Sequence, residues 1–415
     1  MKNFKDSGIE WIGEIPQHWE VSKFKYFYRS NMGETILAQD LKDEGVPIYS
    51  ATEDDKFFGR IKNPINLLNI NDFVIPARGN SIGAVKIVKE KSTCTQTTIF
   101  SKQFKEMNPY YVYYFLSGYR KFLFEFTQTA IPQITISQVN DNPILYPPLK
   151  EQEQIANFLD EKCEQIANFI EKKEKLISLL KERKQVLINE TITKGLDKNV
   201  NFKDSGIEHL GEIPKHWEIK RLATFGRFSK GGNISRQDLV ESGDSALLYG
   251  DIYMNYEIST SCLDSKISKN TSLGAIPIYK GDILFAGSGE TKEDIGKNIV
   301  YLGKDKAFAG GDVIIFRQKE NNALYLSYAL NTKYAKFCKG IESKGEIIVH
   351  IYASNLKDIR IPLPPLKEQE QIAKFLDEKC EKIDLLIEKT KKQIKLIKEY
   401  KTTLINQAVC GRINL

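Results

Sequence analysis

Apolar residues recur at seven-residue intervals in two long segments, one in the middle of the chain and one at its C-terminal end. The positions that share this spacing are Leu159, Ile166, Lys173, Leu180 and Leu187, and then Leu376, Ile383, Thr390, Ile397 and Leu404. The d-like positions between them are filled by Phe169, Leu176, Leu386 and Tyr400, with Ile170, Ile177, Ile387 and Ile394 beside them. A sustained heptad with charged flanks predicts a coiled-coil seam. The polar members Lys173 and Thr390 are expected to fix its register.

Proline and glycine mark the ends of these two helices. Pro147-Pro148 and Pro364-Pro365 stop a helix from extending backwards, and Gly195 and Gly411 stand where glycine commonly caps a helix. A helix of about forty residues is roughly 60 Å long. The two helices either pair antiparallel within one chain or form a dimerisation coil between chains. Their matched length and register favour the intramolecular pair, a rod with a globular domain near each end.

The segments 1–146 and 199–363 lack this helical period and alternate short apolar runs with turn residues. In the first segment the runs 46–49, 72–75, 84–88 and 97–100 predict β-strands. A helix is predicted after Asn108-Pro109, because proline suits a first helical turn. Its many aromatic residues, between Tyr110 and Phe126, are either core or a surface on which bases stack; at helical spacing, core is favoured.

The chain is a tandem duplication. Residues 147–164 return at 364–381 and differ only at Asn157 and Lys374, and residues 3–20 return at 201–218 with three differences. Repeats of this size predict two copies of one structural unit. Between these landmarks the copies diverge: the loop 77–83 stands opposite 286–292 with a different sequence. The repeat order also predicts a nearly circular chain, with Met1 and Leu415 close in space.

Composition adds little to this picture. Hydrophobic residues make up 41% and charged residues 27%, as in ordinary globular proteins, and the net charge of +6 permits DNA binding without arguing for it. The sequence contains no run of eighteen apolar residues, so no membrane span is expected, and the N-terminus lacks an apolar signal core. Six cysteines without a Cys-x-x-Cys pair argue against a zinc site and suit a reducing cytosol.

The sequence offers no catalytic constellation. The run from Phe285 to Gly289 matches Phe-x-Gly-x-Gly, a loop used by adenine methyltransferases, but the Asn/Asp-Pro-Pro-Tyr/Phe loop that such enzymes also need does not occur. Neither a complete phosphate-binding loop nor a Gly-x-Ser-x-Gly or His-Glu-x-x-His motif is present. His18 and its repeat His216 are expected to be structural. Binding is therefore the predicted activity.

Three features together make the chain resemble the specificity subunits of type I restriction–modification enzymes. They are the PPLKEQEQIA start of each long helix, the duplicated Gly-Glu-Ile-Pro-x-His-Trp-Glu segment, and the order domain–helix–domain–helix. Residues 132–137 match the lead-in to the first helix, whereas 349–356 depart from it. The resemblance implies an α+β fold of two similar globular α/β target recognition domains, 1–146 and 199–363. Two conserved long helices, 147–198 and 364–415, would join them as an antiparallel intramolecular coiled coil, pseudo-two-fold and nearly circular.

The resemblance further implies a non-catalytic, cytoplasmic, DNA-binding subunit. Each recognition domain would read one half of a bipartite, asymmetric site in double-stranded DNA. The helices would set the spacer and dock two methyltransferase subunits, and restriction/translocase subunits would complete the enzyme. This chain would bind no cofactor itself; S-adenosylmethionine, ATP and Mg²⁺ would belong to the partner subunits. The alternative is a coiled-coil scaffold whose globular ends bind proteins and not DNA.

Residue chemistry indicates candidate DNA contacts, because arginine reads guanine and asparagine or glutamine reads adenine. The candidates for base contacts are Tyr49, Thr52, Arg78, Asn80 and Ser81 in the first domain, and Tyr249, Asp251, Ser288, Glu290, Thr291 and Lys292 in the second. The candidates for phosphate contacts are Lys102, Lys105, Lys230, Arg236, Lys304 and Lys306. Each of these side chains is also consistent with an ordinary solvated surface residue.

Overall fold

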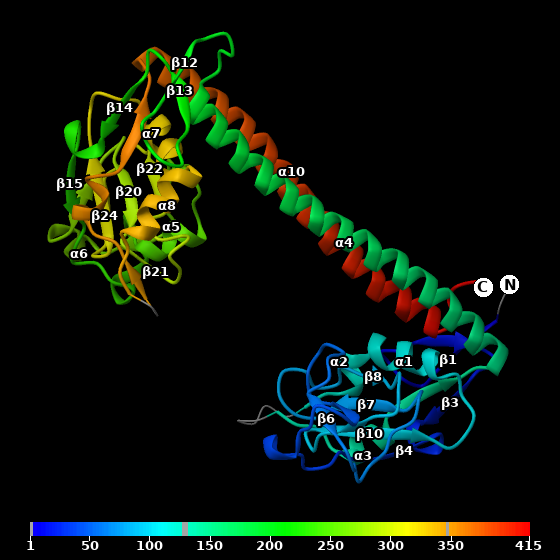
Figure 1. Cartoon of the computed structure of the whole chain (residues 1–415). Coiled ribbons are helices and arrows are strands. Elements are labelled where there is room, and N and C mark those ends of the chain that lie inside the picture. Colours follow the sequence, from blue (N-terminus) through cyan, green and yellow to red (C-terminus); the bar gives the residue numbers. More distant parts are fainter. Residues whose placement is uncertain (1–2, 127–131, 346–347) are drawn as a thin grey trace. The chain divides into compact units, whose positions relative to one another are not determined.

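The computed structural model of the chain describes residues 3–126, 132–345 and 348–415. The chain divides into two compact units, one formed by Met1–Glu174 with Lys391–Leu415 and the other by Lys175–Thr390. Each unit therefore combines a globular domain with the beginning of one long helix and the end of the other (Figure 1). The sequence boundaries treat each helix as a separate segment, whereas the structure shares each helix between the two units.

The globular domain of the first unit is built on a four-stranded sheet of order β4-β10-β7-β8. The strands of this unit are β1 (Phe4–Asp6), β2 (Glu14–Pro16), β3 (Glu20–Lys23), β4 (Tyr28–Met32), β5 (Val46–Tyr49), β6 (Gly59–Ile61), β7 (Phe73–Pro76), β8 (Lys86–Ile87), β9 (Thr93–Cys94), β10 (Thr98–Gln103) and β11 (Pro143–Tyr146). Its shorter helices are η1 (Phe24–Tyr26), η2 (Ala38–Asp40), α1 (Pro109–Gly118), α2 (Arg120–Leu123) and α3 (Ile136–Asp141). The predicted strands and the helix after Asn108 are confirmed, and Asn108 caps α1.

The globular domain of the second unit repeats this plan around a five-stranded sheet of order β15-β24-β20-β22-β17. Its strands are β12 (Phe202–Asp204), β13 (Glu212–Pro214), β14 (Glu218–Arg221), β15 (Arg227–Lys230), β16 (Leu239–Leu247), β17 (Ser259–Thr260), β18 (Lys266–Ile267), β19 (Ile276–Ile278), β20 (Ile283–Ala286), β21 (Ser288–Gly289), β22 (Asn298–Tyr301), β23 (Ala307–Ala309), β24 (Val313–Arg317), β25 (Val349–His350) and β26 (Arg360–Leu363). Its helices are η3 (Leu222–Thr224), η4 (Arg236–Asp238), α5 (Tyr249–Met254), α6 (Lys269–Leu273), α7 (Ala323–Leu330), α8 (Lys333–Ile341) and α9 (Ala353–Leu356).

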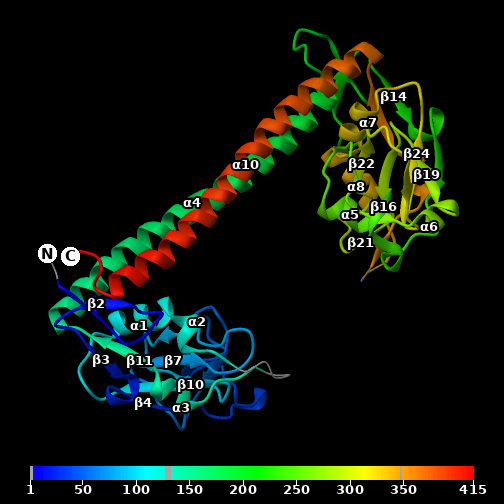
Figure 2. The same ribbon diagram turned by 180° about the vertical axis from the view of Figure 1, so that it is seen from behind.

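The two long helices are α4 (Leu149–Lys194) and α10 (Leu366–Val409), and Figures 1 and 2 both show them side by side. In the first unit the start of α4 and the end of α10 share one core, to which Leu159, Ile166 and Leu404 belong. In the second unit Ile188 shares a core with Leu376 in the same way. The start of each helix thus packs on the end of the other, which is the predicted antiparallel pairing. In the part of the chain that the structure describes, no helix is long and apolar enough to cross a membrane.

Four residues that we expected in the seam lie outside it. Phe169 is 39% exposed, Leu176 40%, Leu386 50% and Tyr400 54%, so their assignment to the seam was wrong. Ile170, Ile177 and Ile387, which follow three of these residues, are buried or half-buried instead, as is Ile394. The remaining expected members, including Lys173, Leu180, Leu187, Ile383, Thr390 and Ile397, are buried or half-buried. The second column of the seam in α4 therefore contains Ile170 and Ile177, and that of α10 contains Ile387 and Ile394.

The repeated motifs contact each other inside each unit. The carboxylate of Glu151, in the first turn of α4, accepts a hydrogen bond from Trp19 Nε1 at 3.0 Å and lies 2.7 Å from His18 Nε2. Glu368 makes the same contacts with Trp217 (3.0 Å) and His216 (2.8 Å). The two motifs recur together because each pair forms the joint between a long helix and the domain that precedes it. The histidines are structural, as expected.

The N-terminal segment and the end of α10 pack together in the first unit. Arg412 Nη2 donates to the backbone oxygen of Ile12, and a Cβ on Gly411 would lie 2.8 Å from the ring of Trp19. In the second unit Gly195, at the end of α4, lies against Trp217 in the same way. The nearly circular repeat order is therefore confirmed at Ile12, Trp19 and Arg412. Met1, which the prediction also named, lies outside the described residues.

Candidate nucleic-acid interface

One candidate loop of the first domain, residues 77–83, leaves the end of β7. Its start is held by a β-bridge between Arg78 and Gln133 and by a hydrogen bond from Gly79 N to Pro132 O at 3.2 Å. Arg78 and Asn80 are exposed and Ser81 is half-buried, whereas Ile82 and Gly83 are buried. The loop therefore presents its middle to solvent and is fixed at both ends.

Two lysines bond to a second candidate loop, residues 50–58. Lys86 is a buried residue of β8, and its Nζ donates to Ser50 O at 3.1 Å and to Thr52 Oγ1 at 2.9 Å. Burial lowers the pKa of Lys86, since it disfavours the charged form. Lys89 forms an ion pair with Asp55 at 2.7 Å. Thr52 itself is exposed, as a DNA contact requires.

Arg120, the first residue of α2, joins these two loops. Its Nε donates to Ile82 O at 2.8 Å, and its Nη1 donates to Glu53 Oε1 at 3.1 Å. The planar guanidinium suits this task because its donors form a rigid fork. Two loops that are separate in the sequence, 50–58 and 77–83, are thereby linked.

The corresponding loop of the second domain, residues 287–296, leaves the end of β20. Ser288 pairs with His350 across β21 and β25, as Arg78 bridges Gln133 in the first domain. Residues 290–294 are exposed, and Ile295 and Gly296 are buried. Tyr253 of α5 donates through its hydroxyl to Asp294 O at 3.3 Å. This loop is again exposed in the middle and anchored at both ends.

Other predicted contacts of the second domain gather near this loop. Lys230 lies 3.9 Å from Asp312, whose backbone oxygen accepts a hydrogen bond from Gly287 N at 2.7 Å. Tyr249 is exposed at the start of α5, and Arg236 Nη2 lies 3.5 Å from where a Cβ on Gly250 would stand. Lys230, Arg236 and Tyr249 therefore join Glu290, Thr291 and Lys292 at one end of the sheet.

Several of the predicted contacts are placed elsewhere. Tyr49 is 1% exposed in a core with Val74 and Phe100, and Ser288 is 3% exposed, so neither side chain is available to DNA and both predictions were wrong. Asp251 is half-buried, and its carboxylate already accepts from Leu248 N at 3.0 Å and Ser265 Oγ at 2.9 Å.

The strand registers place two of the predicted lysines at the far end of each sheet. β10 pairs with β7 from Thr98 opposite Pro76 to Ser101 opposite Phe73, so Lys102 and Lys105 follow the end remote from the loop 77–83. Lys304 and Lys306 likewise follow β22 beyond Tyr301, at the end remote from the loop 287–296. These four residues do not gather with the candidate loops.

Comparison with known proteins identifies the family of the two globular domains. A family model described as "Type I restriction modification DNA specificity domain" matches residues 16–187 and again 214–396. The chain belongs to the type I restriction–modification DNA specificity family. The two matches cover both globular domains together with much of both long helices.

Proteins similar to this specificity chain are known over its whole length. It is 27% identical to the type I restriction enzyme MjaVIII specificity subunit of Methanocaldococcus jannaschii, over 100% of this chain and 96% of that protein. It is 26% identical to the putative MjaX specificity subunit of the same organism, over 100% and 97%. A chain from a study of complex assembly and conformational transition of the type I R-M system has the same fold, with a TM-score of 0.72 at 14% identity, over 96% of this chain and 99% of that chain.

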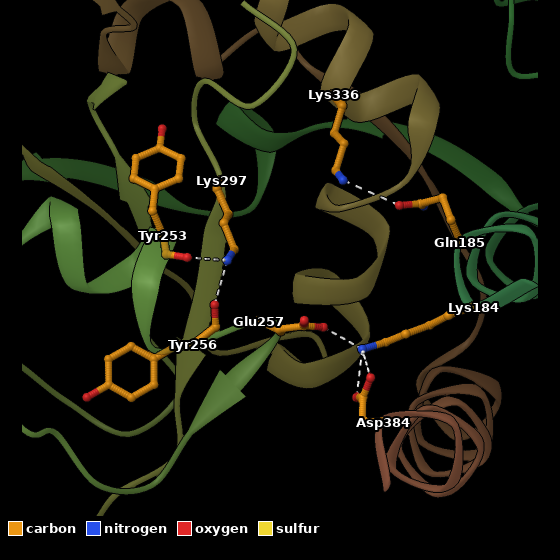
Figure 3. A network of polar contacts seen from close by, with 8 residues as sticks. All are labelled: Lys184, Gln185, Tyr253, Tyr256, Glu257, Lys297, Lys336 and Asp384. Atoms are coloured by element: carbon orange, nitrogen blue, oxygen red, sulfur yellow. Dashed lines mark hydrogen bonds and ion pairs between the residues drawn. The ribbon is translucent and has the colours of Figure 1, made fainter. Parts of the chain in front are cut away.

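In the second unit a polar network joins the recognition domain to the helix pair of this specificity protein (Figure 3). Lys184 of α4 donates through Nζ to Asp384 of α10 at 2.7 and 2.8 Å and to Glu257 of the globular domain. Gln185 accepts from Lys336 Nζ at 3.3 Å. Lys297 Nζ donates to the backbone oxygen of Tyr256 at 2.6 Å, which braces the segment that carries Glu257.

Sequence reasoning missed three cations that shape the candidate loops of the specificity domains: Lys86, Arg120 and Lys339. Lys339 is 0% exposed, and burial lowers its pKa to about 7. A signal was present only for Lys86, a lone lysine inside the apolar run 84–88. Arg120 and Lys339 bond backbone oxygens distant in sequence, which no local pattern indicates. Among the described residues, no group of three or more His, Cys, Asp or Glu could hold a metal ion.

Proposed function

We propose that this chain is the non-catalytic DNA-reading subunit of a type I restriction–modification complex, each globular domain reading one half of a bipartite, asymmetric site. The supporting observation is one scaffold that carries two different loops. The joints Glu151–Trp19 and Glu368–Trp217 are the same in both units, whereas the exposed loop residues are Arg78 and Asn80 in one and Glu290 to Lys292 in the other. Different loops on a common scaffold give two unlike half-sites.

In this proposal the exposed loop residues contact base edges. Arg78 is suited to bidentate contact with guanine and Asn80 to adenine. In the second domain Glu290 is suited to accept from cytosine, and Thr291 is suited to a thymine methyl or to a hydrogen bond. Thr52 of the loop 50–58 and Tyr249 are further candidates for base contacts, whereas Lys230 and Arg236 supply phosphate contacts, which position the protein without reading sequence.

The helix pair sets the spacer between the half-sites and docks the methyltransferase subunits. The exposed apolar residues of α4 and α10 form what we call the apolar edge: Phe169, Leu396 and Tyr400 in the first unit, and Leu176, Leu179, Val186, Leu385 and Leu386 in the second. The globular domains take a different edge, since Asp160 and Ile405 in one unit and Ile188 in the other contact them. An exposed apolar stripe of this kind marks an interaction site.

The apolar edge is itself repeated, which favours two copies of one partner. Phe169 and Leu386 are equivalent positions of the duplication, and so are Leu179 and Leu396. We infer that one methyltransferase subunit docks on each unit and that restriction/translocase subunits join this assembly. S-adenosylmethionine, ATP and Mg²⁺ would be bound by those partner subunits, and the complex would act in the cytoplasm, where the host DNA lies.

The test is selective methylation by the reconstituted complex. The chain is combined with its methyltransferase subunit and S-adenosylmethionine, and methylated molecules are recovered from a randomised duplex pool and sequenced. We expect a split motif whose two halves differ, and Arg78→Ala should relax one half by about 1–3 kcal/mol of discrimination. Arg29→Ala is the matched control, because Arg29 lies opposite Lys102 at the far end of the sheet. No enriched motif would refute DNA reading and favour the protein-binding scaffold.

A further inference from the structure

Equivalent strand registers define where each candidate loop ends. β7 pairs with β8 so that Val74 lies opposite Lys86, and β20 pairs with β22 so that Leu284 lies opposite Ile299. Gly83 stands three residues before Lys86, and Gly296 stands three residues before Ile299. The two loops are therefore residues 77–83 and 287–296, and each ends in the same Ile-Gly pair.

This Ile-Gly pair has the same unusual backbone in both domains. Gly83 has φ +70° and Gly296 has φ +69°, a region that side chains strongly disfavour. A Cβ on Gly83 would lie 2.5 Å from the ring of Phe124, and one on Gly296 would lie 2.9 Å from Cδ of Lys339. The chain turns sharply here, with α2 or α8 packed closely against the turn.

A cation from that packed helix holds a backbone oxygen of the turn in both cases. Arg120 Nε donates to Ile82 O at 2.8 Å, and Lys339 Nζ donates to Gly296 O at 2.7 Å. Arg120 also reaches Glu53 in the neighbouring loop. Different residue types at different positions thus hold the same turn, Arg120 through the oxygen of the isoleucine and Lys339 through that of the glycine.

Lys339 has no acidic hydrogen-bond partner in the described chain, so its contacts are with neutral oxygens. Nζ donates to Leu330 O at 2.8 Å and to Asn298 Oδ1 at 3.3 Å in addition to Gly296 O. Leu330 is the last residue of α7, where carbonyl oxygens favour a cation. Asn298 is itself held by Ser327, a fully buried residue of α7. Burial of a lysine is costly unless its amine is hydrogen-bonded, so these three bonds tie Lys339 to the turn and to α7.

We propose that Arg120 and Lys339 are positioning residues for base recognition, each setting the shape of the loop in its own domain. The inference rests on the proposed function. It assigns specificity for one half-site to a residue that touches no DNA. Each cation acts through its own loop, so loss of either one changes one half of the motif and leaves the other half intact.

The experiment compares Arg120→Met and Lys339→Met in the full chain, assembled with the methyltransferase subunit and given the randomised duplex pool. We expect each variant to lose on the order of tenfold discrimination at one half-site, with the other half-site as its internal reference. The matched controls are Lys121→Met and Lys333→Met, which remove exposed lysines near each cation. Both controls should keep the wild-type motif.

The outcomes separate this inference from the proposed function. A wild-type complex that selects no split motif refutes both. A wild-type motif that persists unchanged in Arg120→Met, or that weakens equally in both halves, refutes the inference alone. If Lys339→Met fails to assemble, Arg120→Met decides, because its side chain is one-third exposed and its loss leaves the core intact. Arg120→Lys should then restore part of the discrimination, since lysine can still donate to Ile82 O.

Discussion

Trp19 Nε1 donates to the carboxylate of Glu151 across 132 residues of sequence, and the indole is 1% exposed. The same bond joins Trp217 to Glu368 in the second unit. A glycine at the end of the other long helix packs against each indole, Gly411 against Trp19 and Gly195 against Trp217. Each buried tryptophan is therefore the point at which the start of one long helix, the end of the other and a repeated N-terminal segment meet.

Removing the acceptor should destabilise one unit. We expect Glu151→Ala to lower the free energy of unfolding of the first unit by about 1–3 kcal/mol, because it leaves a buried indole N–H without a partner. Glu368→Ala should do the same to the second unit. Hydrogen exchange of the amides around Trp19 and Trp217, followed in denaturant, measures the two separately. Glu153→Ala, an exposed position on the same helix, is the control, and an equal effect there would contradict the assignment.

The buried amine of Lys339 predicts a pH dependence of stability. Its pKa in the folded chain is lowered to about 7 by burial, against an ordinary value of 10.5. Between about pH 7 and pH 10.5 the Lys339 amine is protonated in the unfolded state but mostly neutral in the folded state, so the free energy of unfolding rises with pH. Below this range the folded chain bears the full cost of burying a charged amine. The wild type should therefore gain up to about 1.4 kcal/mol per pH unit relative to Lys339→Met between about pH 7 and about pH 9. Urea unfolding of both proteins across that range measures the difference, and a constant difference would contradict a lowered pKa.

The fold was predictable because the duplication and the heptad repeats each extend over many residues. Two copies of the joint and two matched helices specify which segments pair, without knowledge of any single contact. Only the second column of the seam was misplaced, because the positions three and four residues after Ile166 lie on the same face of the helix. Ile170 and Ile177 were the better choice, because they are half-buried whereas Phe169 and Leu176 are exposed.

The candidate site was predictable only as loops. The exposed residues Arg78, Asn80 and Thr291 follow from turn chemistry, but the burial of Tyr49 and Ser288 depends on strand pairing between distant segments. Tyr49 ends a strand that lies over the core, and Ser288 pairs with His350, 62 residues away. Arg120 and Lys339 bond backbone oxygens, which carry no sequence signal.

The ion pairs of Lys184 predict which variants lose more free energy of unfolding. Lys184 is buried in the seam, whereas the side chains of Asp384 and Glu257 are 44% and 70% exposed. Lys184→Met should be tolerated within about 1 kcal/mol, because both acids stay hydrated and methionine suits a seam. Asp384→Asn with Glu257→Gln should cost about 3 kcal/mol or more, since it leaves a buried ammonium without counter-charge. Denaturant unfolding checks the order, with Lys401→Met, the repeat-equivalent lysine, as the control.

The apolar edge predicts how many methyltransferase subunits each variant binds. A buried glutamate in place of a central apolar contact opposes binding, because the carboxylate must lose its hydration without a partner. Phe169→Glu and Leu386→Glu alter equivalent positions in different units and leave the seam intact, since both side chains are exposed. We expect two bound subunits for the wild type, one for each single variant and none for the double variant, as measured by native mass spectrometry of the DNA-free complex. Ser178→Glu adds the same charge at an exposed position on a different edge of α4 and should retain both subunits. Single variants that still bind two subunits with unchanged affinity would place the docking site elsewhere.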